Sequence, residues 1–338
     1  MLKRIEWIDV CKFIGIFIIY FWHLGEGIGR SYQFILVYHV PLFFFLSGCT
    51  ESLQSEISFS DYVKKKAKTI LLPFFVFALL SMLLVICYER CGGTLILLMV
   101  KQILMGGMRN RIFAYSLWFL TCLFVMSLLF FFLKKGKRRS LIFLTGAVLY
   151  VITARVLPYK PNLFPMLPYN ADCALYYMIF YCTGYCLFPK MQELLQEEGK
   201  SRNIVLAAVG ILGGVYAVCL FFGKDGLAAL LRLPVIRIFH PYLSAMILIL
   251  WNTALAFFLQ KSGLLQKLGR ESLYLCGNEF IVKTVAAAGA SCLGIAVPPD
   301  RPVFCAVYAA VLLLTAHFVL IPLEKRIAGL LRFFLNIF

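Results

Sequence analysis

Two ionisable side chains lie within the first apolar segment of the chain, where they could carry out acid–base chemistry. Lys12 and His23 are eleven residues apart in the run WIDVCKFIGIFIIYFWH. At 3.6 residues per helical turn, this spacing places both side chains on nearly the same face, about 16 Å apart along the axis. Asp9 shares that face, three residues before Lys12. The spacing therefore predicts a polar stripe along an apolar helix.

Charged residues inside a membrane-spanning segment are rare, because an isolated charge costs roughly 2.5 to 3.5 kcal/mol on insertion scales. Such residues usually face the interior of a helix bundle and mark a pathway or a reactive site. We therefore take Asp9, Lys12 and His23 as candidate catalytic residues. The alternative is structural: Asp9 and Lys12 form an anchoring pair near the membrane surface, and His23 is a hydrogen-bonded residue at a helix end.

A second histidine follows in the run YHVPLFFFLSG, at the start of the next apolar segment. The connection between the two segments is about ten residues long, so His39 is predicted to lie on the same side of the membrane as His23. Two imidazoles would then face one cavity, where histidine can accept a proton from a hydroxyl group near neutral pH. A structural capping role for His39, just before Pro41, is equally consistent with the sequence.

The chain as a whole is too apolar for a water-soluble fold. Hydrophobic residues occupy 62% of the 338 positions and charged residues only 14%, which excludes an ordinary soluble globule. The apolar segments are spread evenly, and no polar stretch is long enough to form a separate domain. The sequence predicts an all-α, polytopic membrane helix bundle that forms a single domain over residues 1–338.

About ten segments reach the roughly 20 mainly apolar residues that a transmembrane helix needs. They lie near residues 8–25, 35–53, 70–88, 114–133, 140–157, 172–188, 203–222, 239–259, 273–292 and 303–322. The shorter run 94–105, interrupted by Lys101, is predicted to be re-entrant or interfacial, with an eleventh span as the alternative. Residues 325–338 combine basic and apolar side chains and are predicted to lie along the membrane surface.

The basic residues predict the orientation. With the amino terminus inside, most Lys and Arg residues fall in cytoplasmic segments, as the positive-inside rule requires, and both termini are cytoplasmic. The net charge of +17 then reflects topology and attraction to anionic membrane lipid rather than nucleic-acid binding. The twelve cysteines lie mostly in apolar segments without neighbouring histidines or carboxylates, so packing is expected and no metal site.

The same residues carry a resemblance to a known family. The two runs quoted above are followed in order by a basic segment leading into LLPFF, by SLWFL and by LGRESLYLCGNEF. In this order the chain resembles the integral-membrane acyltransferase family 3, whose bacterial members O-acylate sugars, cell-surface polysaccharides and related envelope molecules. The resemblance implies a multi-pass protein of the bacterial plasma membrane that transfers an acyl group, commonly acetyl, from acyl-coenzyme A to a hydroxyl group.

The resemblance also implies roles for particular residues. His23 stands where the family keeps its catalytic histidine, and Lys12 where members carry a basic residue. Relatives often place two arginines three apart before the proline that opens the third span. Here the candidates for binding the donor's phosphates are instead lysines, which lack the planar bidentate contact of arginine: Lys64, Lys65, Lys66 and Lys68.

The late block departs from the family at Glu279, where many relatives have histidine after the equivalent of Asn278. Glu279 is predicted either to accept a proton or bind a sugar hydroxyl, or to neutralise Lys283 four residues later. Asn278 and Trp118 are candidate acceptor-binding residues, although an aromatic residue at a span end can instead belong to an interfacial belt.

Two further interpretations stay open at this point. Arg109 and Arg111, in a predicted outer loop, either meet an anionic glycan or are solvated. The alternative function is a transporter in which Asp9, Lys12, His23 and Glu279 form a proton or solute pathway; the lack of an internal repeat argues against it. The sequence leaves the acyl chain, the exact acceptor and the oligomeric state open.

Overall fold

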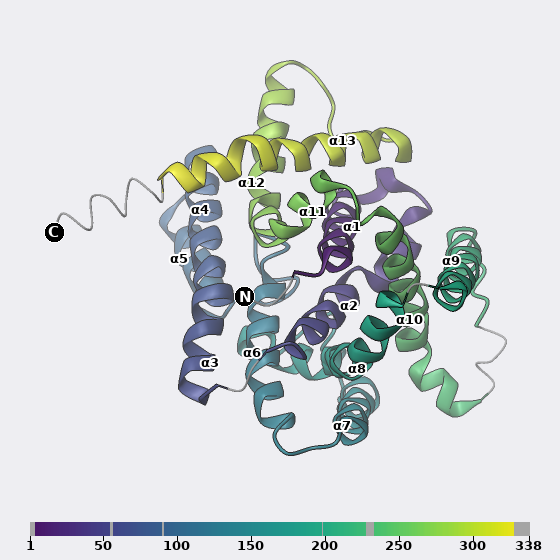
Figure 1. The fold of residues 1–338 in the computed structure, drawn as a ribbon. Helices are drawn as coiled ribbons and strands as arrows, with labels where there is room; N and C mark the ends of the chain where they lie inside the picture. The colour runs from purple at the N-terminus through teal and green to yellow at the C-terminus, as the bar shows by residue number, and fades with distance from the viewer. Residues whose placement is uncertain (1–3, 55–56, 90, 198, 228–232, 328–338) are drawn as a thin grey trace.

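The computed structural model describes residues 4–54, 57–89, 91–197, 199–227 and 233–327, and the regular structure within them is helical without any β-strand (Figure 1). The helices are α1 (Glu6–Trp22), α2 (Ser31–Glu51), α3 (Phe59–Lys66), α4 (Leu72–Glu89), α5 (Gly93–Leu104), α6 (Trp118–Leu133), α7 (Arg139–Val151), α8 (Ala171–Gln196), α9 (Lys200–Phe221), α10 (Pro234–Leu259), α11 (Gly263–Arg270), α12 (Ser272–Cys292) and α13 (Pro302–Thr315). Three π-helical stretches prolong α3 into α4 (Ala67–Leu71), α7 (Ile152–Val156) and α13 (Ala316–Leu320), and short 3-10 turns are Gly25–Ile28 and Pro168–Asn170.

The ten predicted spans fall largely on these helices. By length and composition, six stretches of the described residues are able to cross a membrane: Phe34–Glu51, Phe59–Glu89, Arg139–Val156, Lys200–Phe221, Arg237–Leu259 and Pro302–Ile327. The other four predicted spans lie in α1, α6, α8 and α12, which are shorter or carry more polar residues. These four helices are less apolar because each contributes polar side chains to the protein interior.

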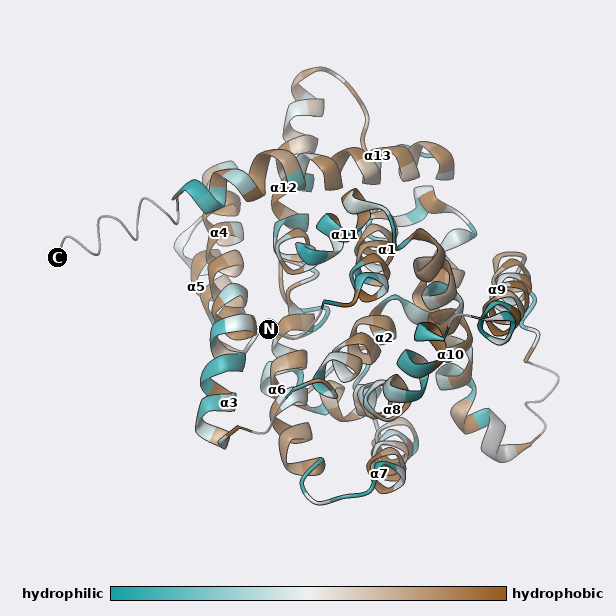
Figure 2. Ribbon diagram, in the orientation of Figure 1, coloured by the Kyte–Doolittle hydropathy of each residue, from teal (hydrophilic) through white to brown (hydrophobic). Residues whose placement is uncertain are grey.

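Apolar side chains cover the outside of the bundle. Figure 2 shows hydrophobic residues along most helices, with hydrophilic residues concentrated in α3, α11 and the connections. On α9, Ile211 is 67% exposed and Leu212 is 69% exposed. An apolar surface of this extent requires lipid rather than water around it. Together with the six apolar stretches, it identifies a multi-pass membrane protein.

α1 occupies the centre of the bundle, in contact with α2, α10, α11, α12 and α13 (Figure 1). Its side chains Val10, Ile16 and Tyr20 are completely buried. α11 approaches α1 very closely, because Gly269 packs directly against the backbone of Asp9, where a Cβ atom would overlap the carbonyl group. The helix that carries the predicted polar stripe is therefore enclosed by protein on several sides.

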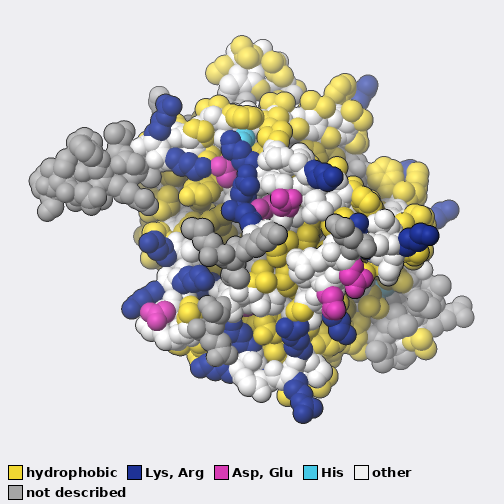
Figure 3. Space-filling view, viewed as in Figure 1, with side chains coloured by type: hydrophobic (Ala, Val, Ile, Leu, Met, Phe, Trp, Pro, Cys, Tyr) yellow, Lys and Arg dark blue, Asp and Glu magenta, His cyan; other side chains and the backbone are white. Residues whose placement is uncertain are grey.

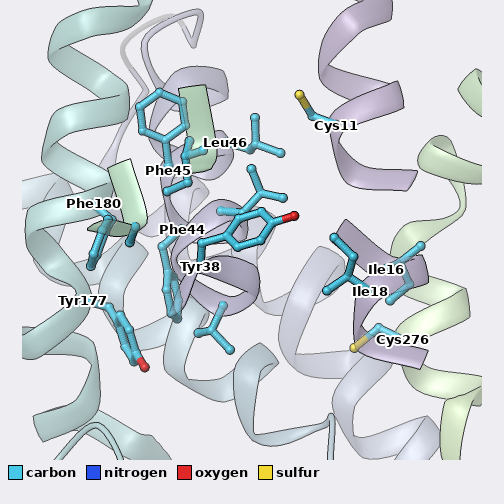
Figure 4. Packing of buried hydrophobic residues seen from close by; sticks show 14 of the residues in the cluster. Cys11, Ile16, Ile18, Tyr38, Phe44, Phe45, Leu46, Tyr177, Phe180 and Cys276 are labelled. Carbon is cyan, nitrogen blue, oxygen red and sulfur yellow. The ribbon is translucent and has the colours of Figure 1, made fainter. Parts of the chain in front are cut away.

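α2 and α8 form the closest helix pair of the core. Gly48 of α2 and Gly184 of α8 each lie against the backbone of the other helix, with no room for a side chain. Small residues at a crossing allow this approach in membrane proteins. One turn from the crossing the rings of Phe44 and Tyr177 stack, with centroids 4.9 Å apart, while Tyr38 of α2 extends toward α1 (Figure 4).

α5 returns alongside α4 instead of leaving the bundle. The two helices pack together, and Gly107, just after α5, lies against the ring of Phe74 near the first residue of α4. The connection from residue 105 to residue 117 that follows is non-helical but largely buried. A re-entrant segment, as predicted for residues 94–105, likewise buries irregular backbone in protein where it lies at membrane depth. The buried connection brings Arg109 and Ser116 into the interior.

A buried carboxylate joins the C-terminal ends of α2, α3 and α6. Glu51 is fully buried, and its oxygens accept hydrogen bonds from Lys66 Nζ at 3.1 Å and Lys134 Nζ at 2.7 Å. The hydroxyl groups of Tyr62 and Tyr181 donate to the same carboxylate, at 3.1 and 3.3 Å. The C-terminal ends of α2, α3 and α6 therefore meet at Glu51.

Replacing Glu51 with glutamine lowers the stability of the bundle by about 3 kcal/mol, because two buried ammonium groups lose their counter-charge. Thermal unfolding of the purified protein in detergent measures this as a lower Tm. The matched control is Glu193→Gln on exposed α8 surface, which leaves the Tm unchanged. Equal Tm values for Glu51→Gln and the parent protein would show that the cluster contributes nothing to stability.

The last predicted segment is only partly described. Residues 325 to 327 continue the helix that begins at Pro302, and Lys325 Nζ donates to Glu271 Oε1 at 2.7 Å. Glu271 also accepts a hydrogen bond from His317 Nδ1 at 2.6 Å. Residues 328–338 of the predicted surface tail lie outside the described residues.

Candidate active site

His23 stands at the C-terminal end of α1, as the residue that caps the helix. Its ring nitrogen Nδ1 lies 2.7 Å from Oε1 of Glu279 in α12. Because an ionised carboxylate only accepts hydrogen bonds, Nδ1–H is the donor and Nε2 carries the lone pair. Nε2 makes no hydrogen bond to any of the described residues. The contact thus fixes the orientation of the imidazole and, in its neutral form, favours the tautomer with the proton on Nδ1.

Glu279 has two further partners, one in its own helix and one in the connection before α6. Lys283, one turn later in α12, donates its Nζ to Oε1 at 2.5 Å, and Ser116 Oγ donates to Oε2. The carboxylate side chain is only 3% exposed, whereas that of His23 is 16% exposed. Of the two predicted roles of Glu279, the structure contains the pair with Lys283, and Glu279 also contacts His23, which was not predicted. A role as proton acceptor or sugar ligand stays a prediction.

A cavity of about 370 Å³ opens beside His23. His39, Tyr115, Arg109 and Trp118 line it, together with Ile19, Trp22, Gly25, Tyr32, Val40, Phe43, Asn110, Ile112, Ser116, Phe119 and Cys276. The predicted placement of His23 and His39 around one cavity thus agrees with the structure. Glu279 does not line the cavity and lies behind His23 instead.

His39 is arranged differently from His23. Its Nδ1 donates to the carbonyl oxygen of Ile35 on the preceding turn at 2.8 Å, and its ring stacks on Trp22 with centroids 5.1 Å apart. α2 begins at Ser31, so His39 lies within the helix and does not cap its start. Trp22 in turn contacts His23 edge-on, with centroids 4.8 Å apart. The indole therefore separates and positions the two imidazoles.

Arg109 is buried in the cavity wall, in contrast to a solvated outer loop. Its guanidinium lies 4.4 Å from the centroid of the Trp118 ring, and Nη1 donates to Tyr177 Oη at 3.0 Å and to the carbonyl oxygen of Asn162. Arg111, two residues later, is exposed. Trp118, the first residue of α6, is a buried wall residue and not part of an interfacial belt.

Asn170 holds the buried connection in place. Its Oδ1 accepts the backbone N–H of Arg109 at 2.8 Å, and Nδ2 donates to Thr121 Oγ1 at 3.0 Å. Nδ2 also lies within 3.4 Å of the carbonyl oxygens of Gly106, Gly107 and Trp118. Asn170 has a φ of +57°, which asparagine tolerates better than most residues. One fully buried amide therefore fixes the loop that supplies Arg109 and Ser116.

Replacing Asn170 with alanine lowers the stability of the protein and the rate of any reaction in the cavity. The change leaves buried backbone groups unpaired, at about 1–3 kcal/mol, and adds about 1–2 kcal/mol because alanine disfavours the left-handed conformation. Thermal unfolding and turnover measure the two effects. Asn203→Ala, at an exposed position of α9, is the matched control. An Asn170→Ala protein as stable and active as the parent would rule out this anchoring role.

Like Glu279, three further candidates from α1 and α12 do not line the cavity. Asp9 forms an ion pair with Arg4, at 2.7 Å between Oδ2 and Nε, so the anchoring pair involves Arg4 and not Lys12. Lys12 is half-buried and makes no hydrogen bond or ion pair within the described part of the chain. Asn278 is buried beside Glu279, but its Nδ2 donates to the carbonyl oxygen of Tyr274 at 3.1 Å.

The predicted phosphate-binding lysines divide into two groups. Lys66 is committed to Glu51, and Lys65 Nζ donates to Gln54 Oε1 at 3.2 Å while remaining exposed. Lys64 and Lys68 are exposed as well. The face seen in Figure 3 carries Lys and Arg side chains over much of its extent, including the region of α3 in Figure 1, and few acidic ones.

The fold is a multi-pass membrane helix bundle, and its site is a histidine held by a buried carboxylate beside a cavity with mostly apolar and aromatic walls. The family model described as an acyltransferase domain matches residues 5–275. The chain therefore belongs to acyltransferase family 3, and it is a membrane acyltransferase. Comparisons with curated proteins and with solved structures gave no match.

Proposed function

We propose that this acyltransferase moves an acyl group, acetyl in the simplest case, from cytosolic acyl-coenzyme A to a hydroxyl group of a saccharide or envelope molecule in the bacterial plasma membrane. His23 is the general base in this proposal. The observation that carries it is the 2.7 Å contact between His23 Nδ1 and Glu279, which leaves Nε2 available to a ligand in the cavity. A base oriented by a carboxylate is the arrangement that activates hydroxyl nucleophiles in many transferases and hydrolases.

The reaction then needs no further protein nucleophile. His23 Nε2 takes the proton of the acceptor hydroxyl as its oxygen attacks the carbonyl carbon of the thioester. The tetrahedral intermediate collapses, the C–S bond breaks, and the imidazolium returns the proton to the departing thiolate. The products are the acyl ester and coenzyme A with a free thiol. Glu279 stabilises the imidazolium that forms in between, and Lys283 offsets the charge of Glu279 in the resting state.

The cavity walls suit a sugar ring. Its volume of about 370 Å³ lies within the usual range of ligand sites. Aromatic side chains from four segments form much of the lining: Trp22, Tyr32, Tyr115, Trp118 and Phe119. Aromatic faces can cover the apolar C–H faces of a saccharide, while Asn110 and the histidines offer polar partners for hydroxyl groups.

The donor is proposed to bind from the end of the bundle that carries α3. The exposed lysines Lys64, Lys65 and Lys68 would meet the nucleotide phosphates as point charges, whereas Lys66 is held by Glu51. Lys12, without a protein partner in the described residues, would meet the pantetheine arm between this end and His23. In this proposal the exposed lysines bind the donor's phosphates and Lys12 contacts its pantetheine arm.

The double variant Lys65→Ala/Lys68→Ala raises the KM for acetyl-coenzyme A by about 10-fold, because each phosphate contact at an exposed lysine contributes about 1 kcal/mol or less. The turnover number stays unchanged, since neither lysine reaches the reacting atoms. The increase shrinks at high salt, as screening of exposed charges requires. Lys190→Ala, another exposed lysine of the predicted cytoplasmic side, is the control. Unchanged KM values in the double variant would place donor recognition elsewhere.

The test of the function itself uses purified protein in liposomes, radiolabelled acetyl-coenzyme A and a panel of saccharides. We expect labelled ester to form in the wild type and acceptor consumption to match coenzyme A release. In parallel, the same liposomes are tested for proton or solute flux without any acyl donor. Flux without ester formation would contradict the proposal and support transport instead.

A further inference from the structure

The acceptor cavity contains a positive charge that the mechanism above does not use. Arg109 is 7% exposed and lines the same cavity as His23. No carboxylate of the described residues comes within ion-pair distance of its guanidinium. Beside the cavity, Lys283 is paired with Glu279 at 2.5 Å. Among the described side chains that line the cavity, Arg109 is the one with a fixed charge.

The guanidinium is held rigidly by one edge only. Nη1 donates to Tyr177 Oη and to the carbonyl oxygen of Asn162, and the ring of Trp118 covers the planar face. The backbone N–H of the same residue is fixed by Asn170. By contrast, Nε and Nη2 have no acceptor among the residues that the structure describes. These atoms form the edge of arginine that binds a carboxylate or phosphate with two parallel hydrogen bonds.

A buried cation with neutral partners is costly, because hydrogen bonds to an amide and a phenol replace only part of its hydration. An anionic ligand in the cavity would supply the missing counter-charge. Arg109 and His23 are held by different elements, the former by α8 and the connection before it and the latter by α12. They can therefore contact two different groups of one ligand.

We propose that the acceptor is an acidic saccharide, whose carboxylate or phosphate binds the free edge of Arg109 while a nearby hydroxyl group faces His23. This inference rests on the proposed function and names its substrate class. A neutral sugar would leave the guanidinium without a counter-charge, so the site discriminates by charge as well as by shape. Arg109 is a specificity-determining residue in this account, and His23 remains the base.

The test compares matched acceptors in the transfer assay with acetyl-coenzyme A. Methyl glucuronide is compared with its methyl ester, which keeps the ring and hydroxyl groups but removes the charge, and glucose 6-phosphate provides the phosphate arm. We expect kcat/KM for a charged acceptor to exceed that for the neutral ester by 10- to 100-fold, the usual gain from charge-assisted hydrogen bonds. The preferred charged acceptor then distinguishes carboxylate from phosphate.

Arg109→Gln is expected to reduce this ratio to about one, mainly by raising KM for the charged acceptor. Arg111→Gln, at an exposed position two residues away, leaves the ratio unchanged. Equal rates on charged and neutral acceptors in the wild type would overturn the proposal. So would an Arg109→Gln protein that loses activity equally on both, since that result indicates a role in folding or in stabilising the intermediate.

A binding measurement separates this inference from the proposed function. Trp22 and Trp118 line the cavity, so tryptophan fluorescence reports its occupation without any transfer. We expect methyl glucuronide or glucose 6-phosphate to bind more tightly than the methyl ester, and Arg109→Lys to bind the charged ligand more weakly than the wild type while keeping some preference for it. If charged ligands bind more tightly but no acyl transfer occurs, the proposed function would be overturned and the charge preference of the cavity would stand. Equal binding of charged and neutral ligands would overturn the acidic acceptor.

Discussion

His23→Ala slows acyl transfer, with kcat expected to fall by about 10²- to 10⁴-fold, the usual contribution of a positioned general base. The bound donor and acceptor remain in place, because the other cavity residues are unchanged, so donor affinity stays within a few-fold of the wild type. Stability changes little, since Glu279 keeps Lys283 and Ser116 as partners. Initial rates and equilibrium binding of acetyl-coenzyme A, measured on the same preparation, distinguish these effects.

The matched control is His240→Ala. His240 forms an ion pair with Asp225, 2.6 Å between Nε2 and Oδ2, and does not line the cavity beside His23. Turnover of this variant is expected to equal that of the wild type. A His23→Ala protein that retains the wild-type rate would remove the imidazole from the reaction, whatever its effect on stability.

Replacing Glu279 is expected to have the second largest effect. A double-variant cycle with Lys283 separates its contribution to stability from its contribution to turnover. Glu279→Gln leaves the buried ammonium of Lys283 without a counter-charge, so stability falls by about 3–5 kcal/mol, and it removes the carboxylate that holds His23, so turnover falls as well. In the double variant Glu279→Gln/Lys283→Met, no unpaired charge remains, and the Tm returns close to the wild-type value. Turnover does not return, because an amide cannot stabilise the imidazolium.

The reduction expected in that double variant is roughly 10³- to 10⁴-fold, similar to the loss when a carboxylate that orients a catalytic histidine is replaced by its amide. Thermal unfolding and kcat are measured on all four proteins of the cycle. If the double variant regained wild-type turnover together with its stability, Glu279 would serve only to neutralise Lys283. That outcome would leave His23 without a functional partner.

Much of this site follows from local sequence patterns. The spacing of apolar residues predicts the helices, and the short connection after α1 predicts that His23 and His39 share a cavity. The separation of four residues predicts the pair of Glu279 and Lys283. Each of these predictions depends on neighbours within one or two turns or on a short loop, and local geometry is enough to fix them.

The remaining features depend on contacts between segments far apart in the chain. His23 and Glu279 are separated by 256 residues, and the packing of α1 on α12 decides their contact. Asp9 has both Arg4 and Lys12 within reach along the sequence, and the arrangement of the chain before α1 selects Arg4. Lys66 was predicted to bind phosphate, but it pairs with Glu51, which lies at the same end of the bundle.

The buried connection after α5 is the largest difference from the sequence-based expectation. Residues 105–117 are irregular and include charged side chains, features that are typical of an exposed loop. Their burial depends on Asn170, which satisfies the backbone of a segment about 60 residues away. No periodicity signals such a contact, so the burial of Arg109 and the contact of Ser116 with Glu279 were missed. A single buried asparagine between a Pro-rich stretch and an apolar helix is the only local hint.

The central claim is that donor and acceptor meet at the imidazole of His23, and a cryo-electron microscopy structure with a non-hydrolysable acetyl-coenzyme A analogue tests it most directly. We expect the acyl carbonyl carbon in the cavity lined by Tyr115 and Trp118, close enough to His23 Nε2 for a hydroxyl group to bridge them, with reacting atoms about 3–3.5 Å apart. The nucleotide would lie at the end that carries Lys65 and Lys68. An analogue bound with its acyl group outside this cavity would contradict the account.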